Sequence, residues 1–111
     1  GFPAARGLPG GQAQARPVYP LSFRVFETAV LMEDIERLPP AVRSKVRTKL
    51  GEYVYPQLRS QPFFGPNIEK LRDWMPATWR YRIGPWRLFY EIDDKNRVIY
   101  LITLCLRRDA Y

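Results

Sequence analysis

Three consecutive segments in the second half of the chain constrain its fold more than any other feature. They are WRYRI at 79–83, WRLFYEI at 86–92 and VIYLITL at 98–104, and each alternates apolar with polar side chains or is apolar throughout. Only short turns separate them, at Gly84-Pro85 and at 93–96. Strand segments joined by such short loops form an antiparallel meander, so the sequence predicts three adjacent strands of one sheet. Because the third segment is apolar on both faces, it suits a central position.

The preceding part of the chain predicts one further strand and two helices. Residues 18–26 alternate like a strand, and Pro20 indicates either an edge position or a later start. Residues 28–38 and 41–54 carry apolar side chains at helical spacing. Because only Pro39-Pro40 separates them, the two helices should form an antiparallel hairpin.

Together these elements predict an α+β fold, in which a two-helix antiparallel hairpin packs on one face of a four-stranded, mainly antiparallel sheet. The expected domain is 18–111, since a chain of 111 residues provides one modest core. Residues 1–17 are rich in Gly and Pro, and we interpret them as a flexible arm, a mistaken start or an expression remnant. Between the helices and the meander, 55–67 is a proline-rich connection, and 68–74 is compatible with an additional helical turn.

Charge and residue usage limit the possible functions. The chain has 18 Lys+Arg against 11 Asp+Glu, a formal net charge of +7, which favours a polyanionic partner. It has no histidine, which excludes Ser-His-Asp and Cys-His nucleophilic sites and nearly all zinc sites. An enzyme of this composition would act through Arg, Lys, Tyr or carboxylates, and we expect neither a metal nor a cofactor.

Cysteine usage and hydropathy indicate a cytoplasmic protein that is not embedded in a membrane. Cys105 is the only cysteine, which rules out an internal disulfide framework and suits a reducing compartment. The longest mostly apolar run, 98–106, has about half of the roughly 20 residues that a spanning helix needs.

Side-chain alternation places three arginines on a common face. Arg80 and Arg82 alternate with the apolar side chains of the first meander strand, and Arg87 alternates with those of the second. If the helices cover the apolar side, the three guanidinium groups lie together on the opposite side, where they suit phosphate binding. The alternative is a set of weak cross-strand ion pairs, such as Arg87 with Glu91 or Asp93.

The domain resembles the RelE-like toxins of the RelE/ParE superfamily, the toxins of type II toxin–antitoxin modules. The resemblance rests on RYRIGPWRLFYEID at 80–93 and VIYLITLCLRRDAY at 98–111. These match an R-x-R-x-G turn, an aromatic-Arg pair, a Tyr-Glu-Ile strand, a second apolar strand and a closing Arg-Arg-Asp-x-Tyr. The resemblance implies the RelE/ParE toxin fold and a cognate antitoxin as partner. Phe63, Phe64 and Trp74 either contact that antitoxin or close the edge of the core.

RelE-like toxins bind mRNA in the ribosomal A site and cleave it by attack of a 2′-hydroxyl on the adjacent phosphate. By resemblance, this chain is a metal-independent endoribonuclease that inhibits translation. The resemblance also implies roles for site residues. Two arginines clamp the reacting phosphate, a closing tyrosine stacks on a base or holds a proton, and further arginines bind the phosphates of the RNA backbone. The implied catalytic residues are Arg87, Arg107 and Tyr111, and the implied phosphate-binding residues are Arg80, Arg82 and Arg108.

The sequence departs from the family pattern at positions that bear on proton transfer. Arg80 and Arg82 stand where some relatives carry lysine, and Leu106 stands where many carry histidine. Because a guanidinium does not release its proton in proteins, no general base is evident. Two other functions therefore stay open: a ParE-like inhibitor of DNA gyrase, and a relative that binds nucleic acid without cleaving it.

Overall fold

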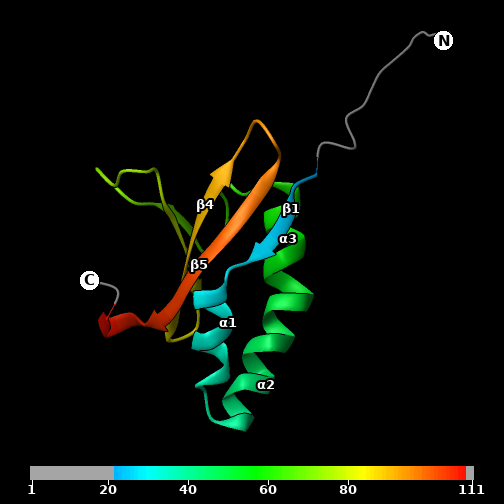
Figure 1. The fold of residues 1–111 in the computed structure, drawn as a ribbon, viewed down its shortest axis with the longest axis vertical. Coiled ribbons are helices and arrows are strands. Elements are labelled where there is room, and N and C mark those ends of the chain that lie inside the picture. Colours follow the sequence, from blue (N-terminus) through cyan, green and yellow to red (C-terminus); the bar gives the residue numbers. More distant parts are fainter. Residues whose placement is uncertain (1–21, 110–111) are drawn as a thin grey trace, which may run out of the picture.

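A five-stranded sheet is the frame of the computed structural model, which describes residues 22–109. The strands are β1 (Arg24–Glu27), β2 (Ile68–Lys70), β3 (Trp79–Ile83), β4 (Trp86–Asp93) and β5 (Val98–Leu106). Their order across the sheet is β1-β5-β4-β3-β2 (Figure 1). β3, β4 and β5 form the predicted antiparallel meander, and β5 occupies the predicted inner position, with β1 parallel to it on its other side. The predicted arm and the start of the first predicted strand, 1–21, lie outside the described residues.

The helices lie on one face of this sheet (Figure 1). They are α1 (Ala29–Glu36), α2 (Pro40–Lys49), the π-helical segment η1 (Leu50–Val54) and α3 (Tyr55–Ser60), and a 3₁₀ turn η2 (Arg107–Asp109) follows β5. The α+β fold with a helical hairpin on one face of the sheet is thereby confirmed. None of the helices within 22–109 is long and apolar enough to cross a bilayer.

Local sequence explains where the helical hairpin begins and turns. Thr28 is the N-cap of α1, and its hydroxyl accepts a hydrogen bond from the backbone N–H of Leu31 at 3.3 Å. Leu31 and Ile35, one helical turn apart, are fully buried and form the core-facing stripe of α1. Pro40 is the first residue of α2, where the missing N–H of proline costs nothing because that position has no intrahelical acceptor.

The expectation of an irregular connection over 55–67 is wrong for its first six residues. Tyr55–Ser60 form α3, which follows the wider turn of η1 and carries Pro56 in its first turn. Val54 and Tyr55 already have helical dihedrals, so Pro56 lies inside a continuous helical stretch and removes one backbone N–H donor from it. Leu58 is fully buried, so core contact stabilises α3 despite its proline.

The expected helical turn over 68–74 is also wrong. Ile68–Lys70 form β2, antiparallel to β3, and Ile68 pairs with Tyr81 and packs against the core. So short a segment has no decisive periodicity, and backbone pairing with the otherwise open edge of β3 determines its conformation. The sheet therefore has five strands instead of the predicted four.

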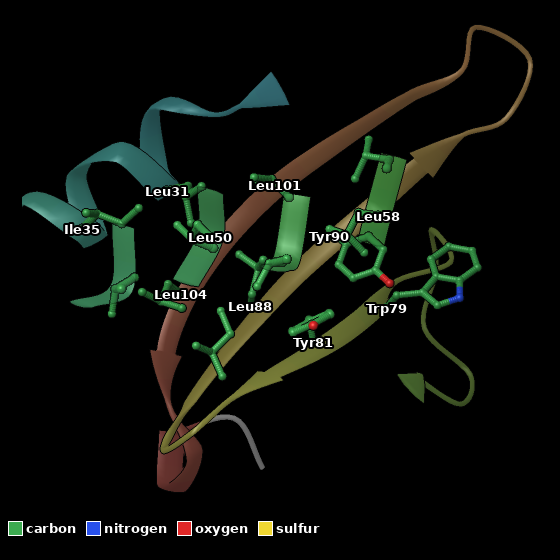
Figure 2. Packing of buried hydrophobic residues seen from close by; sticks show 14 of the residues in the cluster. Leu31, Ile35, Leu50, Leu58, Trp79, Tyr81, Leu88, Tyr90, Leu101 and Leu104 are labelled. Carbon is green, nitrogen blue, oxygen red and sulfur yellow. The ribbon is translucent and has the colours of Figure 1, made fainter. Parts of the chain in front are cut away.

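The hydrophobic core fills the space between the helices and the sheet. Figure 2 shows leucine and isoleucine side chains of the helical layer facing the leucine and aromatic side chains of β3, β4 and β5. Buried aromatics place their polar tips on backbone acceptors: Tyr90 Oη donates to Pro62 O at 2.7 Å, and Trp79 Nε1 to Phe63 O at 3.1 Å. The Phe63 ring packs edge-on against Trp79, with 5.8 Å between centroids, so it closes the core edge.

A β-bulge in β5 lies where the element beside this strand changes from β1 to α1. The β4–β5 register shifts between Phe89 and Tyr90, which leaves Ile102 as the extra residue of β5. β1 ends at this level, and α1 continues along the same edge, where Asp34 Oδ2 accepts a hydrogen bond from Leu104 N at 3.0 Å. A side chain therefore satisfies a backbone donor that β1 does not reach.

Candidate functional site

The sheet face opposite the helices carries three of the predicted site arginines. In β3, the residues that alternate with Arg80 and Arg82 are buried in the core, so these two side chains belong to the other face. Arg82 is directly opposite Arg87 on β4. The pairing of β3 with β4 thus brings the three cations together, as the alternation in the sequence predicted.

These arginines line one cavity of about 290 Å³, here called the arginine cavity. Among the described residues that line it, Arg80, Arg82 and Arg87 are the cations, Glu69 is the one carboxylate, and Asn67 adds a polar amide. Three positive charges against one negative charge make the cavity electropositive. Guanidinium groups that converge from adjacent strands suit a phosphate, which accepts several charge-assisted hydrogen bonds at once.

Arg87 is the most constrained of the three. Only 6% of the residue is exposed, and its Nη1 donates to the carbonyl oxygens of Gly84 at 2.8 Å and Trp86 at 2.9 Å. It makes no salt bridge with Glu91 or Asp93 among the described residues, so the alternative ion pairs of Arg87 are not formed. Arg87 is a buried cation that the β3–β4 turn itself orients.

Arg80 and Arg82 differ in their partners. The Arg80 guanidinium forms a salt bridge of 2.5 Å with Glu69 of β2, across the β2–β3 pair. Arg82 is exposed, and its Nη2 lies 3.5 Å from Asn67 Oδ1, a long contact that leaves the group adaptable. The arginine cavity therefore combines one fixed cation, one ion-paired cation and one adaptable cation.

Of the remaining predicted site residues, Arg107 and Arg108 do not line the arginine cavity. Arg107 is exposed at the start of η2, and its backbone N–H donates to Pro85 O at 2.8 Å, which places η2 beside the β3–β4 turn (Figure 2). Arg108 is also exposed and does not line the cavity. Tyr111 lies outside the described residues.

A second cavity, of about 530 Å³, lies on the same sheet face, and we call it the Trp74 groove. Trp74, Met75, Phe89 and Cys105 are among the residues that line it. The Trp74 and Phe89 rings are 5.7 Å apart between centroids and inclined by 34°. Trp74 is half exposed, whereas Phe89 is buried beneath it. Sequence analysis did not assign Phe89 or Cys105 to a site.

The environment of Cys105 is not that of an activated nucleophile. Partial burial raises the pKa of its thiol, and the carboxylates of Asp109 and Asp34 raise it further. The positive charges of Arg80 and Arg87 oppose this rise without reversing it. Cys105 is therefore protonated at neutral pH, and within 22–109 no three His, Cys, Asp or Glu side chains gather into a possible metal site.

The acidic and amide residues of the arginine cavity escaped sequence analysis for an identifiable reason. Glu69 lies on β2 and Asn67 directly precedes that strand, and the sequence was interpreted as a connection and a helical turn at these positions. No sequence signal marks this strand, because Ile68 is followed by two charged residues and 68–70 therefore shows no alternation, and three residues are too few to decide a period.

Comparison with known proteins agrees with this fold. The family model described as "ParE toxin of type II toxin-antitoxin system, parDE" matches residues 31–111. Among characterised proteins, Toxin RelG of Mycobacterium tuberculosis is 27% identical over 92 residues, which cover 82% of this chain and 98% of RelG.

Solved structures share the fold at lower identity. The toxin–antitoxin complex RelBE2 from M. tuberculosis contains a chain with a TM-score of 0.61 and 24% identity, covering 78% of this chain and 99% of that one. The archaeal RelE–RelB complex from Pyrococcus horikoshii gives a TM-score of 0.58 at 22% identity, with 78% and 96% coverage. Because the family model spans most of the chain and these structures share its architecture, the protein belongs to the ParE toxin family of type II toxin–antitoxin systems, within the RelE/ParE superfamily.

Proposed function

We propose that this toxin cleaves mRNA on the ribosome and so inhibits translation. The observation that supports this function best is the arginine cavity, because Arg80, Arg82 and Arg87 converge there from adjacent strands. A toxin that acted only through a protein surface would not need three guanidinium groups in one cavity on a rigid sheet. A single-stranded RNA backbone supplies the complementary charge.

The proposed reaction is a transesterification. The 2′-oxygen of one nucleotide forms a bond to the adjacent phosphorus, and the bond from phosphorus to the 5′-oxygen of the next nucleotide breaks. The products are a 2′,3′-cyclic phosphate and a 5′-hydroxyl. The 2′-hydroxyl loses one proton and the departing 5′-oxygen gains one, so no net proton is consumed.

Arg87 is the residue best prepared to stabilise this reaction. The carbonyl oxygens of Gly84 and Trp86 hold its guanidinium before substrate arrives. A preoriented cation stabilises charge that grows on the non-bridging oxygens without having to reorganise. We propose that Arg107 completes the clamp, that Arg80, Arg82 and Arg108 bind neighbouring phosphates, and that Tyr111 stacks on a base or holds a proton. Guanidinium groups do not act as the base, so catalysis is mainly positioning and electrostatics, with the ribosome aligning the mRNA.

We further propose that a cognate antitoxin binds this toxin. Related toxins from M. tuberculosis and P. horikoshii were solved in complexes named for their RelB-type antitoxins. Phe64 and Trp74 are large exposed apolar side chains of the kind that such a partner covers.

The test is cleavage on translating ribosomes, mapped by primer extension on a reporter mRNA. Arg87→Ala and Arg107→Ala should each lower the cleavage rate by about 10²- to 10³-fold, the effect of removing one preorganised donor from a transition state. Arg37→Ala is the matched control, because Arg37 pairs with Glu33 and Asp34 on α1. Arg107 is exposed, so loss of folding would not account for its effect. Unchanged cleavage in both variants would contradict the proposed site.

Inhibition of DNA gyrase is the second candidate, favoured by the match to the ParE family model. It predicts inhibited supercoiling and accumulated gyrase–DNA breaks, with intact reporter mRNA. A relative that only binds nucleic acid predicts salt-sensitive binding and neither kind of break. Running the supercoiling assay beside primer extension therefore separates the three functions.

A further inference from the structure

We infer that the Trp74 groove binds one nucleobase of an RNA strand, stacked on the Trp74 indole, while the arginine cavity holds the adjoining phosphate. The inference rests on the proposed function insofar as it takes RNA as the ligand. It assigns a role to an aromatic pair, Trp74 and Phe89, that is distinct from the predicted catalytic and phosphate-binding residues.

Strand geometry places the Trp74 groove next to the arginine cavity. Phe89 follows Arg87 by two residues on β4, so both side chains leave the same face, roughly 7 Å apart along the strand. Phe89 is also directly opposite Arg80 on β3. A phosphate bound by Arg87 and Arg80 would therefore have the groove beside it, at the place where the base of the same or next nucleotide must lie.

Charge separates the two cavities into different chemical roles. The arginine cavity has three cationic side chains, whereas the described residues that line the Trp74 groove include Glu91 and Asp109 and no Lys or Arg. A phosphate would be repelled from the groove by these carboxylates. A neutral aromatic base would not be repelled, and the exocyclic amino groups of bases donate hydrogen bonds to carboxylates.

The floor of the groove is apolar, and its two threonine hydroxyls already donate hydrogen bonds within the protein. Thr78 Oγ1 donates to Pro76 O at 2.9 Å, and Thr103 Oγ1 donates to Asp34 Oδ2 at 2.5 Å. A ligand would therefore bind the groove mainly through apolar contact area rather than through many hydrogen bonds. A flat π-system supplies such area at little entropic cost.

Trp74 has the exposure that a stacking platform needs. Its side chain is 50% exposed, with the Phe89 ring packed close by and only 6% exposed. The indole is thus supported by the sheet while part of its surface stays open to solvent. Met75 beside it is 92% exposed, and its flexible thioether can close over a bound base.

The experiment compares two single-stranded hexamers that carry the same phosphates. One is an ordinary RNA, and the other has abasic riboses throughout, so only the first can stack. Binding is measured by fluorescence anisotropy on the isolated toxin without ribosomes. Trp74→Ala should weaken binding of the ordinary hexamer by about 5- to 150-fold, the range for loss of one base–aromatic stack. Its affinity for the abasic hexamer should change by less than about twofold.

Two further variants make the result specific. Trp74→Phe keeps a ring and should retain most of the affinity for the ordinary hexamer. Phe26→Ala is the matched control, because Phe26 is similarly exposed, at 55%, but lies on β1 at the other edge of the sheet. It should leave both affinities unchanged.

Several outcomes would overturn the inference. Equal losses with both hexamers, or no loss with either, would show that Trp74 does not stack a base, as would failure of the unaltered toxin to prefer the ordinary hexamer. If Trp74→Ala weakens only antitoxin binding or self-association, a protein occupies the groove instead. Failure of the proposed function looks different: base-dependent binding through Trp74 would persist while ribosomes carrying the toxin left mRNA intact.

Discussion

Glu27 shows how a single carboxylate joins β1 to the helical layer. Its Oε2 accepts hydrogen bonds from Tyr55 Oη at 2.5 Å and from Arg47 Nη1 at 2.7 Å. Partial burial acts to raise the pKa of Glu27, but the hydrogen bonds from Tyr55 and Arg47 outweigh it, so the pKa is lowered. Burial raises the pKa of Tyr55, and the hydrogen bond to Glu27 raises it further. The three side chains therefore favour a charged Glu27 and a neutral Tyr55 in the folded state.

We predict that Glu27→Gln destabilises the fold in a pH-dependent way. Because the folded-state pKa of Glu27 is below its unfolded value, its contribution is present above about pH 4.5 and is lost as the pH falls through the folded-state pKa. The variant should be less stable than the unaltered protein by about 1–3 kcal/mol at pH 7 and by less at pH 3. Urea denaturation at both pH values measures the difference.

Glu33→Gln is the control for this prediction, since the Glu33 side chain forms an exposed i,i+4 pair with Arg37 at 3.6 Å. Its effect should stay within about 1 kcal/mol at either pH. A stability gap for Glu27→Gln that is as large at pH 3 as at pH 7 would rule out the charged form as its cause.

At the scale of single elements, two glycines differ in the backbone conformation that they adopt: that of Gly84 disfavours alanine, whereas that of Gly51 favours it. Gly84 has φ +55° at the first central position of the two-residue β3–β4 turn, the conformation that type II′ turns take there. Gly51 lies within η1, in helical surroundings. An added Cβ meets no atom within 4 Å at either position, so backbone conformation alone decides the effect of alanine.

We predict opposite changes in stability at these two positions. Gly84→Ala should destabilise the protein by about 1–2 kcal/mol, the cost of a left-handed backbone in an L-residue. Gly51→Ala should stabilise it by up to about 1 kcal/mol, the difference in helix propensity. Thermal and urea unfolding of the pair measure both values. A gain in stability at Gly84 would exclude the left-handed turn.

Elements with many repeats of a periodic signal could be predicted, and short ones could not. β4 and β5 span eight and nine residues, and α1 and α2 each place several apolar residues on one stripe, so periodicity identified them. β2 has three residues, and α3 contains Pro56, which reads locally as a breaker. Tertiary contacts determine both: β2 pairs with an open edge, and α3 buries Leu58.

At the scale of the whole molecule, the net charge of +7 and the three arginines of the arginine cavity predict salt-sensitive RNA binding. Three phosphate contacts to single-stranded RNA give a slope of about −2 in a plot of log affinity against log salt. Arg82→Ala should reduce the slope by about 0.7 and, because Arg82 is exposed, leave stability nearly unchanged. Titration of the ordinary hexamer between low and moderate salt measures the slope.

Arg37→Ala again serves as the control, because it removes one positive charge from the helical side of the molecule. Its slope should equal that of the unaltered toxin. If Arg82→Ala leaves the slope unchanged, the arginine cavity is not where the RNA backbone binds.

The convergence of the arginines could be predicted because strand alternation and hairpin pairing are local rules. Arg82 and Arg87 are five residues apart, and the turn between them fixes their register. The partner of Arg80 and the Trp74 groove could not be predicted, since Glu69 and Trp74 reach the face through segments whose course depends on the completed sheet. Local sequence patterns thus predict the positive charge of the site, whereas the residues that surround it depend on tertiary structure.

The hydrogen bonds from Arg87 to Gly84 and Trp86 couple ligand occupancy to the opening of the hairpin. By thermodynamic linkage, a ligand held by this guanidinium makes opening of the turn less favourable. The free energy of this effect equals the free energy by which the closed turn favours ligand binding. Amide hydrogen exchange at the tip of the hairpin would therefore slow when the site fills. Substitutions in the turn that never touch the ligand would weaken its binding by shifting the same equilibrium.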